Sequence, residues 1–143
     1  GAIVAGRTDQ QHWLTFGVEE TLPLLYGDQP VLMSDDKSEA VVRIGVISPD
    51  DSFQAEHASS AFGWSTIPTG HKLTVRMSGL LWPEAAQRVA NSAYLTRERL
   101  GRGQIILFSG EPNFRGSARG SNRLLLNAIV YGAGLGTSAK VEL

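Results

Sequence analysis

The residues whose types and spacing best suit binding or catalysis lie close together near the C-terminal end of the chain. They are Glu111, Asn113, Arg115, Arg119 and Asn122. They follow an apolar run and precede a helical periodicity, so they would surround the N-terminus of a helix, where backbone N–H groups and arginines can hold a carboxylate or another anion. The structural alternative, which we favour, is that Arg115 pairs with Glu111 and Asn113 hydrogen-bonds the loop backbone. We take these five residues as a speculative binding set and assign no catalytic residue.

Zinc chemistry has no local motif in this chain. His12, His57 and His71 lack the spacings H-E-x-x-H and H-x-x-E, and there is no cysteine to join them. We therefore expect no metal ligand and no cofactor, with a long-range site made by all three histidines as the alternative. His12 is expected to cap a turn or to stack on Trp13.

Two further patterns have a functional and a structural interpretation. The spacing of Gly132, Gly134 and Gly136 suggests a phosphate loop, but the Walker lysine is missing, so we expect residues 133–143 to be a loose tail. Aromatic side chains near Gly- and Ser-rich segments could stack on a sugar if exposed, although core packing is the interpretation we favour. These aromatic residues are Trp13, Phe16, Phe53, Phe62, Trp64 and Trp82.

The elements that would position the cluster are a strand and a helix. The run QIILF at residues 104–108 is continuous, apolar and bounded by glycines, which is typical of a strand covered on both faces in a parallel or mixed sheet. The helix would start near Ser121 and Asn122 and stop at Gly132. In open α/β sheets, ligands bind at the carboxyl ends of the strands, where this cluster falls.

The rest of the chain contains more strands than helices. Pro23 makes residues 22–26 an edge strand or an extended segment. Pro83 and Glu84 favour the start of a second helix that would run to about Ala90. Other strands are expected at residues 2–5, 31–33, 40–47, 74–78 and 93–98. We predict an α/β fold with a mixed, largely parallel sheet and flanking helices.

A family resemblance is carried by the segment GRGQIILFSGEPNFRG…GSNRLLLNAI, with HWLTFG and MSGLLWPE upstream. These motifs resemble the C-terminal glutamine-amidotransferase-like domain of bacterial M14-type zinc carboxypeptidases. The resemblance implies part of a flavodoxin-like fold, a periplasmic or secreted location, and the catalytic peptidase domain of the same polypeptide as partner. Amidotransferase chemistry needs a cysteine, which is absent, and Ser109 and Gly110 stand where its histidine would be.

Composition restricts the possible partners. The chain has 143 residues, a net charge of −1 and 42% hydrophobic residues, which fits a single accessory domain over residues 1–143. We expect the chain to be a fragment of a longer parent protein, with Gly1 as a processing or tag remnant. We expect no nucleic-acid partner, because there is no basic excess. No apolar run approaches the roughly 20 residues of a membrane span.

These observations lead to one expected function and two alternatives. We expect a non-catalytic accessory domain of a zinc carboxypeptidase-like protein, which supports the catalytic domain or binds substrate, a peptide or a glycan. The first alternative is a small hydrolase or transferase that uses the Glu111 to Arg115 loop. The second is a pure protein-interaction module.

Overall fold

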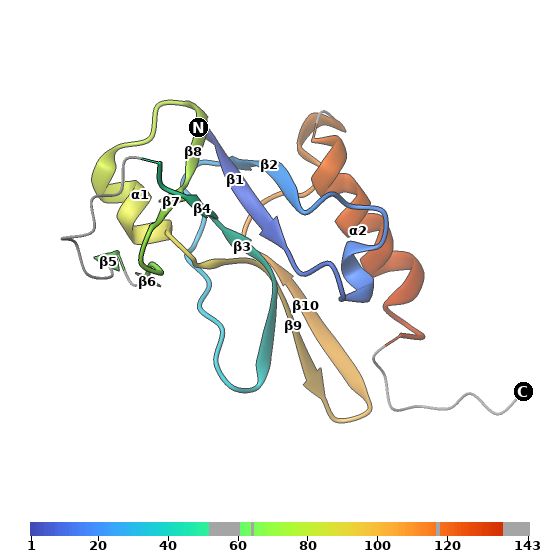
Figure 1. Ribbon diagram of the computed structural model, residues 1–143. Coiled ribbons are helices and arrows are strands. Elements are labelled where there is room, and N and C mark those ends of the chain that lie inside the picture. The colour runs from blue at the N-terminus through green and yellow to red at the C-terminus, as the bar shows by residue number, and fades with distance from the viewer. Residues whose placement is uncertain (52–60, 64, 117, 136–143) are drawn as a thin grey trace, which may run out of the picture.

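The computed structural model describes residues 1–51, 61–63, 65–116 and 118–135 (Figure 1). Within these residues the main sheet has six strands, in the order β10, β9, β3, β1 and β2, with β8 also paired to β1. The strands of this sheet are β1 (Ala2–Thr8), β2 (Thr21–Tyr26), β3 (Ser38–Ile44), β8 (Arg76–Gly79), β9 (Ala93–Leu100) and β10 (Gly103–Phe108). Two short pairs lie outside it: β4 (Val46–Pro49) with β7 (His71–Thr74), and β5 (Ala61–Phe62) with β6 (Ser65–Thr66).

Every strand pair described is antiparallel, so the predicted α/β fold with a largely parallel sheet is wrong. The protein is mostly β, with a curled antiparallel sheet and two short α-helices, and it is not a flavodoxin-like or amidotransferase-like α/β domain. The physical reason is connectivity. Parallel neighbours need crossovers of a dozen or more residues, usually helical, whereas β9 and β10 are joined directly by a tight turn at Gly101.

The strand β10 shows why the prediction of a strand covered on both faces at residues 104–108 is wrong. It lies at the sheet edge, and among the described strands it pairs with β9 alone. Ile105 and Leu107 are 38% and 51% exposed, while Ile106 and Phe108 pack against the core. A run of apolar residues therefore indicated a strand correctly, but not a strand buried on both faces. The edge position predicted for the segment with Pro23 is confirmed, because β2 ends the sheet on its other side.

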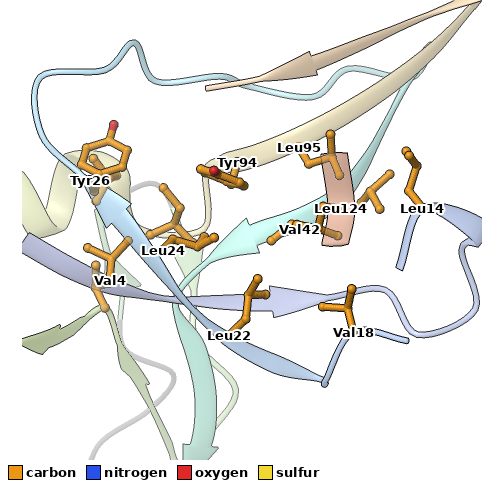
Figure 2. Packing of buried hydrophobic residues seen from close by; sticks show 14 of the residues in the cluster. Val4, Leu14, Val18, Leu22, Leu24, Tyr26, Val42, Tyr94, Leu95 and Leu124 are labelled. Carbon is orange, nitrogen blue, oxygen red and sulfur yellow. The ribbon is translucent and has the colours of Figure 1, made fainter. Parts of the chain in front are cut away.

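The core lies between the curled sheet and the longer helix, α2 (Arg119–Tyr131) (Figure 2). Leu124 of α2 is fully buried, as are Leu24 of β2, Val42 of β3 and Leu95 of β9. Two register shifts between β3 and β9 bring Val41 and Val42 both into buried positions. Such bulges bend a strand and increase its twist, which fits the curl of the sheet.

A buried amide joins α2 to the short 3₁₀-helix η1 (Trp13–Thr15). Asn127 Nδ2 donates to the backbone oxygens of Leu14 at 2.8 Å and Phe16 at 2.9 Å. Arg123 Nε donates to the same Phe16 oxygen at 3.1 Å. These contacts fix the helix that follows the predicted site loop to the segment that follows β1.

Other predicted elements differ mainly at their ends. The second helix is α1 (Pro83–Val89), with proline in the first turn as expected. The expected strand at residues 40–47 breaks into β3 and β4 at Gly45, whose φ of 101° only glycine adopts easily. Residues 31–33 form no strand, and Leu32 makes a single bridge to Ala93.

Two other expectations concern the segments before α1 and after α2. Residues 74–78 were expected as one strand and fall in β7 and β8. The expected tail at residues 133–143 lies largely outside the described residues, but Gln104 Nε2 donates to the Leu135 oxygen.

Candidate functional site

The predicted site residues belong to the loop that joins β10 to α2 and to the first turn of that helix. The loop contains a second 3₁₀ turn, η2 (Phe114–Gly116), in which Arg115 has a positive φ of 50°. Ser121 was expected as an N-cap, but α2 begins earlier, with Ala118 as N-cap. Ser121 Oγ instead donates to the oxygen of Pro112 at 2.8 Å, which ties the loop to the helix.

Only part of the predicted cluster comes together. In the amide orientation that satisfies its surroundings, Asn122 donates to Asn113 Oδ1 at 3.0 Å and to the Pro112 oxygen at 2.7 Å. Arg115 is exposed, and its guanidinium lies 5.1 Å from the centre of the Phe114 ring. The ion pair that we expected between Arg115 and Glu111 does not form among the described residues. Arg119 is exposed as well.

A pocket of about 660 Å³ opens beside this loop, and we call it the acidic pocket. Such a volume falls in the range of small-molecule sites. Of the five predicted site residues, Glu111 alone lines this pocket, together with Phe114 from the same loop. The full lining is Gly1, Leu25, Tyr26, Gly27, Asp28, Gln29, Phe108, Ser109, Gly110, Glu111 and Phe114.

The opposite wall of the acidic pocket is the turn after β2, held in place by Gln29. Its side-chain oxygen accepts from the N–H of Gly27, and its backbone oxygen accepts from Tyr26 Oη at 3.3 Å. Gly110 lies against this side chain, since a Cβ built there would be 3.4 Å from Gln29 atoms. The turn and the loop therefore contact each other at residues that both line the pocket.

The pocket is apolar with a carboxylate at two places on its rim. Asp28 and Glu111 are both exposed, and no side chain in the lining is basic. Ser109 is only 4% exposed, and its Oγ finds no hydrogen-bond partner among the described residues. A buried hydroxyl without a partner is uncommon in a folded protein and needs an explanation.

Aromatic residues provide the apolar surface of the acidic pocket. Phe108 packs edge-on against Tyr94, with ring centres 6.2 Å apart. Burial raises the pKa of Tyr94 to about 12, while a hydrogen bond with Ser121 opposes the shift. Burial also raises the pKa of Tyr26, against the effect of the Arg88 charge. Both phenols are therefore neutral at ordinary pH and act as hydrogen-bonding, apolar groups.

The histidines do not join this site. His12 caps η1, because its Nδ1 accepts from the N–H of Leu14 at 3.1 Å, and its ring lies 5.5 Å from that of Trp13. Both roles foreseen for His12 are thus confirmed. His12 Nε2 lies 3.3 Å from Glu39 Oε2, and burial lowers the pKa of His12 although Glu39 opposes this. His71 Nδ1 contacts the Thr69 oxygen, and His57 lies outside the described residues.

Metal ligands do not gather in the part of the chain that the structure describes: no group of three or more His, Asp or Glu side chains is close enough to hold an ion. Among the aromatic residues considered for sugar stacking, Trp13 and Phe62 pack against the core, whereas Trp82 and Phe16 are exposed. Trp64 and Phe53 lie outside the described residues.

Sequence reasoning missed half of the pocket. The composition of the segment from Gly27 to Pro30 indicates a turn and nothing more, and nothing local connects it with a loop about 80 positions away in the chain. The connection comes from the core, where Tyr26 and Phe108 both pack. An exposed acidic residue in a turn beside an aromatic strand end was the available signal.

Comparisons with known protein families, curated proteins and solved structures give no match for this chain. Among the described residues, no helix is long and apolar enough to cross a membrane.

Proposed function

We propose that this chain is a non-catalytic accessory domain of a zinc carboxypeptidase-like protein and that it binds substrate through the acidic pocket. The observation that carries the proposal is the pocket itself, which combines an aromatic wall with two exposed carboxylates. The link to a peptidase rests only on the motifs at residues 101–129, the segment that supplies β10, the loop and most of α2, since the amidotransferase-like fold that the same resemblance implied is wrong.

The chemistry of the pocket favours binding over catalysis. A hydrolase or transferase in this loop would use Glu111 and Arg115 together, but Arg115 is not part of the lining, and neither is any histidine. A nucleophile within reach of a base is also missing from the lining, since Ser109 Oγ has no partner among the described residues. This geometry gives the alternative of an enzyme little support.

The ligand that fits best is a peptide segment with a basic side chain next to an apolar one. The rings of Tyr26, Phe108 and Phe114 offer an apolar surface, and Asp28 and Glu111 offer two negative charges that no basic side chain in the lining neutralises. Aromatic faces also attract cations. The unpartnered Ser109 hydroxyl can add a hydrogen bond to a ligand after a small rotation of its side chain.

A titration followed by NMR tests the pocket. The probes are N-acetyl-Phe-Lys-amide and its neutral counterpart N-acetyl-Phe-Gln-amide. We expect saturable shifts at Gly27 and Gly110 for the lysine peptide, with a Kd of about 1 mM or weaker for a ligand of this size. The double variant Asp28→Asn/Glu111→Gln should lose the preference for lysine, whereas Glu19→Gln, at an exposed position outside the pocket, should keep it.

Two results would count against the pocket. One is the absence of shifts at these glycines with either peptide. The other is equal binding of the two peptides by the unmodified chain. Either result would remove the peptide-binding function and leave only the proposed domain context.

The domain context has its own test. The parent gene is expected to encode a zinc carboxypeptidase domain in the same polypeptide. In that protein, Asp28→Asn/Glu111→Gln should raise KM for a lysine-containing peptide and leave kcat unchanged, because a remote binding residue does not touch the reacting bond. A parent gene without a peptidase domain, or an unchanged KM, would contradict the accessory role.

A second candidate, the interaction module, is favoured by the outer face of α2. Ile129 and Val130 are 69% and 57% exposed, and Leu126, Tyr131 and Leu135 are exposed beside them. Exposed apolar groups that gather in one area mark protein contacts more often than isolated ones do. The expected contact is the catalytic domain of the same polypeptide. Ile129→Lys/Val130→Lys should loosen that contact in the parent protein, seen as faster hydrogen exchange in α2, and unchanged exchange would exclude it.

A further inference from the structure

Two arginines lie directly opposite each other in the main sheet, and we call them the arginine pair. Arg7 of β1 and Arg43 of β3 are register partners in the antiparallel pairing of these strands. Like charges in such positions repel each other. Burial and the charge of Arg43 both lower the pKa of Arg7, which shows that the pair is held in an unfavourable environment.

Neutral groups hold the arginine pair in place. Arg7 Nη2 donates to Asn91 Oδ1 at 3.1 Å, and Arg43 Nη1 donates to the backbone oxygen of the same asparagine, also at 3.1 Å. Arg43 Nη2 donates to Ser34 Oγ at 2.9 Å. Asn91 reaches both guanidinium groups from a left-handed backbone conformation, with φ at 58°. One residue thus orients both cations without neutralising either.

Neither arginine of the pair forms an ion pair with a carboxylate in the described part of the chain. The ion pairs found there involve other residues. Arg7 Nη1 is buried without a hydrogen-bond partner among the described residues. Both arginines line a pocket of about 410 Å³ at the end of β1. Two oriented cations, an unused donor and an adjoining pocket are what an anion site requires.

We propose that the arginine pair binds a small oxyanion, preferably the single carboxylate of an organic acid. A carboxylate can accept from both guanidinium groups at once, and its charge removes the repulsion between them. The site is independent of the acidic pocket, since the two linings share no residue. Failure of one proposal therefore leaves the other unaffected.

The surroundings decide between a carboxylate and a phosphate. Asp9 and Glu20 line the same pocket, and their negative charges disfavour a doubly charged anion more than a singly charged one. Gln10 and Gln11 also line the pocket and offer neutral amides to the remainder of the ligand. A monoanionic carboxylate therefore fits better than inorganic phosphate.

The test is an NMR titration with sodium propionate and with sodium phosphate at constant ionic strength, following the N–H groups of Arg7, Arg43 and Asn91. We expect saturable shifts with propionate and weaker binding of phosphate. Arg43→Gln should weaken propionate binding about tenfold, because it removes one of the two charge-assisted donors. Arg102→Gln removes the same charge at an exposed turn and should change nothing.

Folding and binding can be separated in this experiment. Arg43→Gln removes a like charge, which offsets the loss of the hydrogen bonds to Asn91 and Ser34, so without propionate the variant should be about as stable as the unmodified chain. It should gain less stability when propionate is added. Glu20→Gln should bring phosphate binding closer to that of propionate. Equal propionate binding by Arg43→Gln and the unmodified chain, or unsaturable shifts spread over the surface, would overturn the proposal.

Discussion

The substitution Asn127→Ala tests how the fold holds the helix behind the acidic pocket. Asn127 is only 1% exposed, and its amide is the link between α2 and η1, which lie more than 100 positions apart in the sequence. The amide donates to the oxygens of Leu14 and Phe16. Removing it breaks both hydrogen bonds and leaves the side-chain volume unfilled.

The expected loss in the free energy of unfolding depends on which hydrogen bonds the Leu14 and Phe16 oxygens keep in the variant. The Phe16 oxygen retains the hydrogen bond from Arg123, so its loss is about 1 kcal/mol. The Leu14 oxygen keeps no other partner among the described residues and becomes a buried, unpaired acceptor, which costs about 1–3 kcal/mol. Together, Asn127→Ala should lower the free energy of unfolding by about 2–4 kcal/mol.

Urea unfolding followed by circular dichroism measures this change. The control is Ile129→Ala, on the same helix but 69% exposed, which should change the free energy of unfolding by less than about 0.5 kcal/mol. Asn127→Asp keeps the shape but turns a donor into a carboxylate facing two carbonyl oxygens, so it should be at least as destabilising as the alanine. Equal stability of the Asn127→Ala and Ile129→Ala variants would refute the reasoning.

Three further predictions concern single positions. Because burial lowers the pKa of His12, the unfolded chain binds a proton at this histidine more readily than the folded chain does. The contribution of His12 to the free energy of unfolding should therefore be fully present above about pH 6.5 and be lost as the pH falls through the folded-state pKa. His12→Asn should remove that part of the pH dependence of urea unfolding. Gly63→Ala should cost about 2 kcal/mol or more, because its Cβ would lie 1.9 Å from the Gln87 oxygen. At Gly101, with a similar φ and no atom within 4 Å, the same change should cost only about 1 kcal/mol in urea unfolding, and equal costs would contradict the steric argument. Arg115→Ala should cost no more than about 0.5–1 kcal/mol, since the side chain is exposed and its one interaction found among the described residues is with the Phe114 ring; a larger loss in urea unfolding would indicate a further partner.

Strand positions could be predicted from the sequence because they depend on local pattern. The residues of β9 and β10 have strand-forming character, and Gly101 between them supplies the positive φ of a tight turn. The error was to interpret the apolar run of β10 by its composition alone. A tight turn between two strands already requires that they be antiparallel, so the hairpin was the stronger indication of topology.

The candidate site could be predicted only where it is local in sequence. Glu111 follows directly from the loop between a strand and a helix, and it lines the acidic pocket together with Phe114 of the same loop. Asp28 and the arginine pair depend on how distant strands pair. The opposition of Arg7 and Arg43 is set by the register of β1 with β3, which alternation of polar and apolar residues does not specify for a bulged strand.

The two proposed sites lie at opposite ends of β1, and they are proposed to bind groups of opposite charge. Gly1, just before the strand, lines the acidic pocket, and Arg7 near its end lines the other pocket. At about 3.3 Å per residue, an extended strand separates them by about 20 Å. Substitutions this far apart, with no shared partner, should act independently on binding. The strand β1 thus connects a proposed cation site at one end with a proposed anion site at the other. A ligand that engages both sites would have to be an extended chain with a basic group at one end and a carboxylate at the other.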